Sequence, residues 1–517
     1  MNTSKLELSK YAAVLILSLL VFGCARNPES LKDRLSVKTP IKTDDGWITR
    51  SAAAAGSDTL KLRNLLRRVE EREYPGIDGI LIVKDGELVF EKYFPGYDYE
   101  YTAKDFKGRY TDYDYRTVHN LASVTKSVTA ILCGIAVDKK MLHGVDDRVS
   151  AYFPEVESLF TGGKERLTVE HLLTMSSGLD WNEQNVFYSN RANDIIQLFL
   201  VRAPVNYILS KPLINEPGTK WYYNGGGTNL VGQVIQRGSG MRLDYFADKY
   251  LFDPLGIRSS KWVYINRDFV YCSGDLRLRP RDMAKLGQLV LDKGTWKGSR
   301  VVSAEWVERM TQKQVTMPHD EGYGYQWWLV PYRLGPRSFE TFQATGWGGQ
   351  KIIVIPDLRS VVVITGSNYT GHDPGNDMMY NYIIPALDGD FRYDFAGIRN
   401  AAPLTDTTVA ASTVTSASRN AEGHWYGEWE GHVQPLQLLV GRAGGSKIPV
   451  SYSWAPLPEF DINGGSVRTE AAADSSNAFS IALRDTFRFR YDPVEDVILA
   501  NMRNEHVFIK AVLRREN

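Results

Sequence analysis

The chain has 517 residues, of which 43% are hydrophobic and 24% charged, as expected for a globular protein long enough to form several domains. Basic and acidic residues number 61 each, so the formal net charge is zero. A balanced charge creates no long-range field toward a polyanion, which argues against nucleic acid as a partner.

The first 24 residues have the layout of an export signal. Lys5 and Lys10 precede an apolar run over residues 11–22, which is too short to span a bilayer comfortably. Gly23 and Cys24 follow, and a small residue before a cysteine resembles the bacterial lipoprotein cleavage site. We therefore expect an exported, periplasmic protein whose Cys24 carries a lipid that anchors it to a membrane; a plain cleaved signal is the alternative.

Ordered structure is predicted to begin at residue 59. Residues 25–58 are polar and alanine-rich, which is typical of a linker. A helix is predicted over residues 59–72 and a β-hairpin over residues 79–93, with its turn at Asp85-Gly86. Tyrosines and aspartates crowd residues 93–115 without a steady period. This segment is predicted to be a solvated loop, with a pocket wall or a sugar-binding surface as alternatives.

The only S-x-x-K sequence in the chain is formed by Ser123 and Lys126, and an apolar stretch over residues 130–137 follows it. Positions i and i+3 share one helix face, so the lysine amine can reach the serine hydroxyl. Burial can lower the pKa of a lysine until the amine accepts the serine proton. The free N–H groups at a helix start also favour an oxyanion. The pattern predicts a serine nucleophile with a lysine base.

Two later stretches could complete such a site. Tyr223 lies in the glycine-rich segment 217–232, where its phenol can point into a cleft and transfer a proton beside a lysine. Thr345-Gly346-Trp347 enters a predicted strand, and glycine there lets the backbone approach a substrate and donate an N–H. An aromatic turn and a β-bulge are the structural alternatives.

Several other residues are candidates for structural or pocket roles and not for the catalytic step. Glu170 and His171 lie in a capped helical turn, where structural roles are expected, whereas Trp181, Asn182 and Glu183 are candidate pocket residues on a loop. Cys133 and Cys272 are predicted to be two separate buried thiols. Cysteines and histidines do not share zinc-ligand spacing, so neither a metal nor a cofactor is predicted.

The three motifs together resemble the serine β-lactamase and penicillin-binding-protein superfamily, in particular its class C-like esterase branch with the nylon-oligomer hydrolases. S-x-x-K, P-G-T-x-W-x-Y and G-x-G-G-Q occur in this order within residues 59–395. Supporting matches lie at residues 172–179, 280–287 and 323–328. The resemblance implies an α+β fold: an antiparallel sheet flanked by helices, plus a helical lobe.

The resemblance also implies roles for residues. Ser123 would be the acylated nucleophile, Lys126 its general base and Tyr223 the phenol that shuttles a proton to the leaving group. The backbone N–H groups of Ser123 and Trp347 would form the oxyanion hole, with Thr345 and Gly346 beside the substrate.

One position departs from the family pattern. Penicillin-recognising members have a lysine or histidine where this chain has Ala344. The cation that holds a substrate carboxylate is therefore missing there. This argues against efficient β-lactam hydrolysis and against cleavage at a free D-alanine carboxylate, and it leaves esters and uncharged amides.

The C-terminal part is predicted to be a separate domain. Residues 396–420, rich in Ala, Thr and Ser, are typical of a linker. Residues 421–517 are predicted to form a small all-β domain that resembles lipocalin-like modules, because six strand-like segments recur there: 424–429, 436–440, 450–454, 479–483, 487–491 and 507–513.

Two functions follow from these features. The first is an exported serine hydrolase that acts through an acyl-enzyme on a small-molecule or peptide-like ester or amide. The second is a catalytically weak envelope receptor that binds peptides or β-lactams. The sequence gives neither the acyl group nor the leaving group of the substrate.

Overall fold

The computed structural model describes residues 31–388, apart from 318–320, 335–336 and 372, and the backbone of eight strands between residues 423 and 515. Cys24 and the predicted linker 396–420 lie outside the described residues. A short helix, α2 (Leu31–Arg34), belongs to an N-terminal unit of its own that ends at Val37. In the described residues, no helix is both long and apolar enough to cross a membrane.

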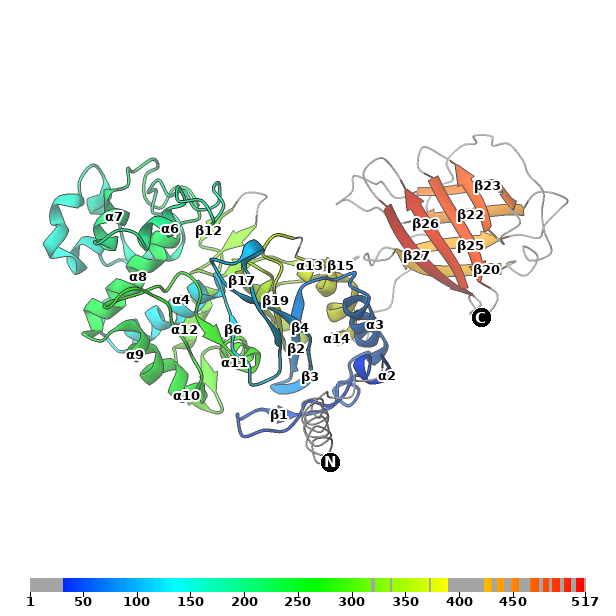
Figure 1. Ribbon diagram of the computed structural model, residues 1–517, viewed down its shortest axis with the longest axis horizontal. Helices are drawn as coiled ribbons and strands as arrows, with labels where there is room; N and C mark the ends of the chain where they lie inside the picture. The colour runs from blue at the N-terminus through cyan, green and yellow to red at the C-terminus, as the bar shows by residue number, and fades with distance from the viewer. Residues whose placement is uncertain are drawn as a thin grey trace, which may run out of the picture. The chain divides into compact units, whose positions relative to one another are not determined.

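A nine-stranded sheet organises the main domain, in the order β1-β3-β2-β19-β18-β17-β14-β13-β12 (Figure 1). All neighbouring strands are antiparallel except β1 and β3, which confirms the predicted antiparallel sheet. The strands are β1 (Ile48–Thr49), β2 (Ile77–Lys84), β3 (Glu87–Tyr93), β12 (Val315–Thr316), β13 (Gly322–Tyr323), β14 (Trp328–Leu329), β17 (Phe342–Gly346), β18 (Gln350–Ile355) and β19 (Ser360–Gly366).

Helices cover both faces of this sheet, since every residue of β18 and β19 is buried. Helix α11 (Pro280–Leu291) packs on β2, β18 and β19. A Cβ at Gly287 would lie 2.4 Å from a methyl of Val361, so glycine permits this close packing. Helices α3 (Thr59–Glu70) and α14 (Ile384–Leu387) lie on the other side (Figure 1).

Turn chemistry explains two element boundaries. The hairpin of β2 and β3 turns at Asp85 and Gly86, which both have positive φ, 51° and 78°, as a two-residue type I′ turn requires. The predicted hairpin is therefore confirmed. Helix α3 ends two residues before the predicted position, ahead of Arg72, whose φ of 61° is left-handed and cannot continue a helix.

The helical lobe is built around two long helices that pack on each other, α4 (Val124–Asp138) and α8 (Gly225–Ser239). Nearly all residues of α4 are buried, as its apolar sequence predicts. Cys133 on α4 and Cys272, which lies against α8 at Gly232, are both buried free thiols, which confirms that prediction. Shorter helices complete the lobe: α5 (Val169–Leu173), α6 (Asp194–Leu198), α7 (Pro204–Ser210) and α9 (Leu243–Ala247).

The predicted linker 25–58 extends too far, because residues from about 41 onward belong to the main domain. Trp47 is buried, and Ile48 and Thr49 form β1 beside β3. The Arg281 guanidinium, itself buried, bonds to the Ile41 carbonyl. A single tryptophan and one remote arginine fix this segment, and neither creates a periodic signal.

Residues 93–115 are not simply a solvated loop. Strands β4 (Pro95–Tyr99) and β5 (Lys107–Asp112) pair as a hairpin. Its connection carries Phe106, which is buried against Trp347 with ring centroids 4.8 Å apart. The alternative of a pocket wall applies to the tip of this hairpin, because Tyr99 and Tyr101 line a cavity described below.

The C-terminal strands form a closed eight-stranded barrel, β20 to β27. The six predicted strands correspond to six of these, whereas β23 and β26 were not predicted. The strands are β20 (Gly423–Trp429), β21 (Pro435–Val440), β22 (Ile448–Trp454), β23 (Gly465–Ala473), β24 (Ala478–Ala482), β25 (Thr486–Asp492), β26 (Val497–Arg503) and β27 (Phe508–Arg515).

Candidate active site

Ser123 occupies the N-cap position of α4, at the end of a tight turn. Ala122 before it has a φ of 43°, a left-handed conformation that is strained for a residue with a side chain. The Asn120 side chain supports the turn by accepting from the Ala122 N–H at 2.6 Å and donating to Asp275 at 3.0 Å. The turn thus holds the serine hydroxyl at the positive end of a long, buried helix.

Lys126 lies one turn further along α4, as the spacing predicted. Its Nζ donates to Ser123 Oγ at 3.0 Å and to the carbonyl of Ser273 at 2.6 Å. The residue is only 2% exposed. Burial alone disfavours the ammonium, but the oxygens of Tyr223 and Glu183 favour it more strongly, so the pKa of Lys126 lies above its ordinary 10.5. The predicted lowering of this pKa is wrong in direction.

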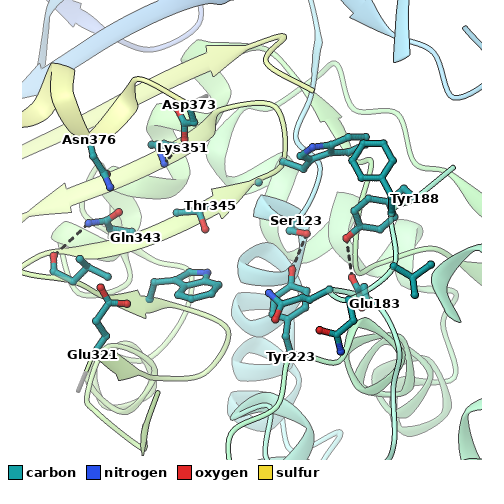
Figure 2. A pocket seen from close by; sticks show the side chains of 18 residues that line it. Ser123, Glu183, Tyr188, Tyr223, Glu321, Gln343, Thr345, Lys351, Asp373 and Asn376 are labelled. Carbon is teal, nitrogen blue, oxygen red and sulfur yellow. Dashed lines mark hydrogen bonds and ion pairs between the residues drawn. The ribbon is translucent and has the colours of Figure 1, made fainter. Parts of the chain in front are cut away.

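Tyr223 reaches the same hydroxyl from α8's N-terminal side. Its Oη donates to Ser123 Oγ at 2.8 Å, and Lys126 Nζ lies 4.8 Å from the centre of its ring. Asn224, the N-cap of α8, accepts from the Gly227 N–H and fixes the turn that carries the tyrosine. Neighbouring Tyr222 lines neither of the two cavities described below. The structure therefore brings together Ser123, Lys126 and Tyr223. Figure 2 shows the contact between Tyr223 and Ser123.

Glu183 is a further functional residue, which the sequence marked only as a candidate pocket residue. The carboxylate is buried and accepts from the Gly225 N–H at 2.7 Å, from Trp181 Nε1 at 2.9 Å and from Tyr188 Oη at 3.1 Å. Its Oε1 lies 3.8 Å from Lys126 Nζ. Three donors and the Lys126 amine surround this carboxylate, and its charge is one of the causes that raise the pKa of Lys126.

The third motif lies alongside Ser123. Gly346 ends β17, and a Cβ on it would lie 2.4 Å from the Leu121 carbonyl and 3.0 Å from the Ser123 nitrogen. Only glycine lets the strand approach this closely. The next N–H along the chain belongs to Trp347, so the two predicted oxyanion donors lie at the same end of α4. Thr345 points into the cavity beside them (Figure 2).

The Trp347 side chain is the centre of an aromatic cluster. Ring centroids of Phe106, Phe187, Tyr188 and Tyr369 lie 4.8, 5.7, 5.1 and 5.4 Å from that of Trp347. The cluster joins the β4–β5 hairpin to the loop after Glu183.

Two cavities meet at Ser123. The first, of about 760 Å³, extends along β17 and is lined by Tyr223 and by polar residues, among them Glu321, Gln343, Lys351, Asp373 and Asn376 (Figure 2). The second, of about 630 Å³, is mainly apolar, with Ile195, Ile196, Phe199, Leu200, Val263 and Tyr271 in its wall. Ser123, Tyr188 and Trp347 line both.

A lysine lines the first cavity although Ala344 leaves the motif position without a cation. Ala344 is buried and faces away from Gln343 and Thr345, which line the cavity. Lys351 on β18 pairs directly with Thr345 and so points to the same face. Its Nζ bonds to Asp373 Oδ2 at 2.8 Å, so its charge is already compensated. The short turn between Gly346 and Gln350 fixes the pairing register of β17 with β18, and this register could have placed Lys351 on the same face as Thr345.

His171 has the structural role expected of it, because its ring and the Thr168 hydroxyl form a reciprocal cap on α5. In the described residues, His, Cys, Asp and Glu side chains do not gather in groups of three that could hold a metal ion.

Comparisons with known proteins agree with this geometry. The family model described as Beta-lactamase matches residues 62–379. The chain is 26% identical to a 6-aminohexanoate-dimer hydrolase of Paenarthrobacter ureafaciens, over 59% of this chain and 75% of that protein. It is 22% identical to an N-acetylmuramyl-L-alanine amidase of Bacillus subtilis (62% and 84%) and 31% identical to a lovastatin esterase of Penicillium rubens (34% and 46%).

A solved structure supports the fold. A Bacillus anthracis protein provisionally assigned as a 6-aminohexanoate-dimer hydrolase superposes with a TM-score of 0.50 at 20% identity, covering 62% of this chain and 80% of its own. Because the family match spans more than half of the 517 residues and includes the serine, lysine and tyrosine described above, this chain belongs to the beta-lactamase family.

Proposed function

We propose that the protein is a serine hydrolase that cleaves a carboxylic ester or amide through an acyl-enzyme on Ser123. The observation that carries this proposal is the convergence of two groups on one hydroxyl: Lys126 Nζ at 3.0 Å and Tyr223 Oη at 2.8 Å from Ser123 Oγ. The names of the relatives, which include two amide hydrolases and an esterase, support both substrate classes.

The raised pKa of Lys126 decides which residue acts as the base in this proposal. An ammonium has no lone pair, so Lys126 cannot be the base that the motif resemblance implied. Tyr223 Oη accepts the Ser123 proton as the bond from Oγ to the carbonyl carbon forms, and it passes its own hydroxyl proton to the leaving group as the bond between carbonyl carbon and leaving group breaks. The phenol gains one proton and loses one, so it is neutral before and after the step. Lys126 remains cationic and stabilises negative charge on both oxygens.

Water completes the reaction by the reverse route. It attacks the ester of Ser123 and passes a proton to Tyr223 Oη, while the phenol's own proton goes to Ser123 Oγ as the acid leaves. The N–H groups of Ser123 and Trp347 stabilise the oxyanion in both halves. The compensated charge of Lys351 and the apolar Ala344 disfavour substrates that depend on a free carboxylate in the first cavity.

Intact mass after treatment with a fluorophosphonate probe tests the proposal. We expect a single adduct on Ser123 that is lost in Ser123→Ala and strongly slowed in Lys126→Ala. A folded wild-type protein that stays unlabelled would contradict the hydrolase. Acylation by an activated ester without release of the acid would favour the receptor function instead.

We also propose that the protein is exported and anchored to a membrane through a lipid on Cys24. The support is the sequence alone, Lys5 and Lys10 before an apolar run that ends at Gly23-Cys24. Metabolic labelling with a palmitate analogue should mark the wild type and not Cys24→Ser. Equal labelling of both proteins, or of neither, would overturn the lipid anchor.

A further inference from the structure

The two cavities that meet at Ser123 differ in chemistry. The first cavity is mixed, because carboxylates, amides and the Lys351–Asp373 ion pair line it together with apolar side chains such as Trp328 and Val330. Aliphatic and aromatic side chains from α6, from the residues after it and from residues 263–271 line the second. Three of the charged groups in its wall have partners: Arg277 bonds to Asp98 at 2.6 Å, Asp275 accepts from Asn120 at 3.0 Å and Glu100 accepts from the Thr102 hydroxyl at 2.9 Å. The fourth, Arg191, is exposed to solvent. The second cavity is thus suited to an apolar group.

Tyr223 distinguishes the two sides of the scissile bond. It lines the first cavity and is absent from the wall of the second. Tyr223 Oη gives the proton to the leaving group in the proposed reaction, so the leaving group has to lie on the tyrosine's side, within hydrogen-bond reach. The acyl group, on the other side of the carbonyl carbon, then extends past Tyr188 and Trp347 into the second cavity.

We infer that the substrate is an ester or amide with an apolar acyl group, held in the second cavity, and a polar alcohol or amine as leaving group, held in the first. The inference rests on the proposed function and deepens it. A cavity of about 630 Å³ is within the range of sites that enclose a small-molecule ligand. Burying an apolar chain there is favourable because it removes hydrocarbon surface from water. A polar leaving group replaces its water contacts with those of Gln343 and Asn376.

Two isomeric esters test this orientation on the unmodified protein. Glyceryl octanoate has an apolar acyl group and a polar leaving group, and octyl glycerate has the same atoms with these roles exchanged. We expect kcat/KM to be at least about tenfold higher for glyceryl octanoate, measured by titration of the released acid. Equal values, or a preference for octyl glycerate, would overturn the inference.

The proposed function is tested separately in the same experiment by p-nitrophenyl acetate, whose small acyl group does not need the second cavity. Hydrolysis of this ester with no preference between the isomers would overturn only the proposed placement of the acyl group in the second cavity and of the leaving group in the first. A folded protein that cleaves none of the three esters would sink the proposed function itself.

A substitution in the second cavity locates the acyl group. Ile196→Glu places a carboxylate in the apolar wall, so the ratio of kcat/KM for p-nitrophenyl octanoate to that for the acetate should fall about tenfold or more. Ile214→Glu is the matched control, because Ile214 is 52% exposed and lines neither cavity. An unchanged ratio in a folded Ile196→Glu protein, or an equal fall in the control, would contradict the assignment; if Ile196→Glu does not fold, the isomer pair decides.

Discussion

At the scale of single residues, the adjacent Tyr222 and Tyr223 allow a catalytic role to be distinguished from a packing role. Tyr223 bonds to Ser123 Oγ, whereas Tyr222 lies outside both cavity walls. We expect Tyr223→Phe to lower kcat by about 10²–10⁴ because the proton relay is lost. The matched Tyr222→Phe should stay within about threefold of wild type. Comparable losses in the two variants would show that the aromatic turn, and not the phenol, is what matters.

The fixed charge of Glu183 gives a pH signature. Without its anion, one of the causes that raise the pKa of Lys126 is lost and this pKa falls, so the ammonium is lost at a lower pH. In Glu183→Gln, the alkaline limb of the kcat/KM profile should therefore move to lower pH, with the activity below that limb reduced. Trp181→Phe removes a donor to Glu183 and keeps the charge, so its limb should not move. An unmoved limb in Glu183→Gln would assign Glu183 a purely structural role.

At the scale of elements, the approach of β17 to α4 sets the oxyanion hole. Gly346 does not have a positive φ, so Gly346→Ala tests only the added methyl, which meets the Leu121 carbonyl. We expect kcat/KM to fall by about 10²–10³, as for the loss of one oxyanion donor, and the thermal unfolding temperature to fall as well, because backbone atoms have to move to admit the methyl. Gly371→Ala, which meets nothing closer than 3.9 Å, is the control. Wild-type activity in Gly346→Ala would show that the strand can move without cost.

The sequence predicts elements best where one local rule decides. The Asp85-Gly86 turn, the glycines at 346, 348 and 349 and the apolar α4 each carry such a rule, and the hairpin, the third motif and the central helix follow from them. Strand β1 has two residues and was missed because its pairing partner is remote. Strand β23 was missed because its sequence, GSVRTEAAA, lacks the aromatic and aliphatic alternation of its neighbours.

In the site, too, features set by local spacing could be predicted and features set by remote segments could not. The spacing of Ser123 and Lys126 predicts their contact, and the resemblance placed Tyr223 and the third motif beside them. The direction of the Lys126 pKa could not be predicted, since it depends first on Tyr223 and then on Glu183, which reaches the lysine through a loop without periodicity. The second cavity is likewise invisible in the sequence, because its wall combines segments near residues 100, 195 and 270.

At the scale of the whole molecule, Arg281 ties the N-terminal segment to the domain. Its guanidinium is 1% exposed and bonds to Glu91, Asp45 and the Ile41 carbonyl. Arg281→Met should lower the free energy of unfolding by about 3–5 kcal/mol, because Glu91 is left buried and unpaired. It should also make residues 38–50 sensitive to limited proteolysis.

The exposed pair of Arg50 and Glu87 is the control for that variant. Its side chains are 49% and 28% exposed, so Arg50→Ala should cost less than about 1 kcal/mol. A similarly small cost in Arg281→Met, with the segment still protected, would mean that Trp47 alone holds the N-terminal segment in place.

The two buried thiols, Cys133 and Cys272, can report on opening of the helical lobe. Burial raises the pKa values of Cys133 and Cys272 to about 12, so the reactive thiolate is scarce at neutral pH and inaccessible in the folded chain. Each thiol reacts only in molecules whose lobe has opened. In a Cys24→Ser protein, Cys133 and Cys272 are the only cysteines left. The rate of thiol alkylation in that protein therefore measures how often the lobe opens. For the same reason, oxidative damage at these sulfurs is confined to molecules that have already lost their active site.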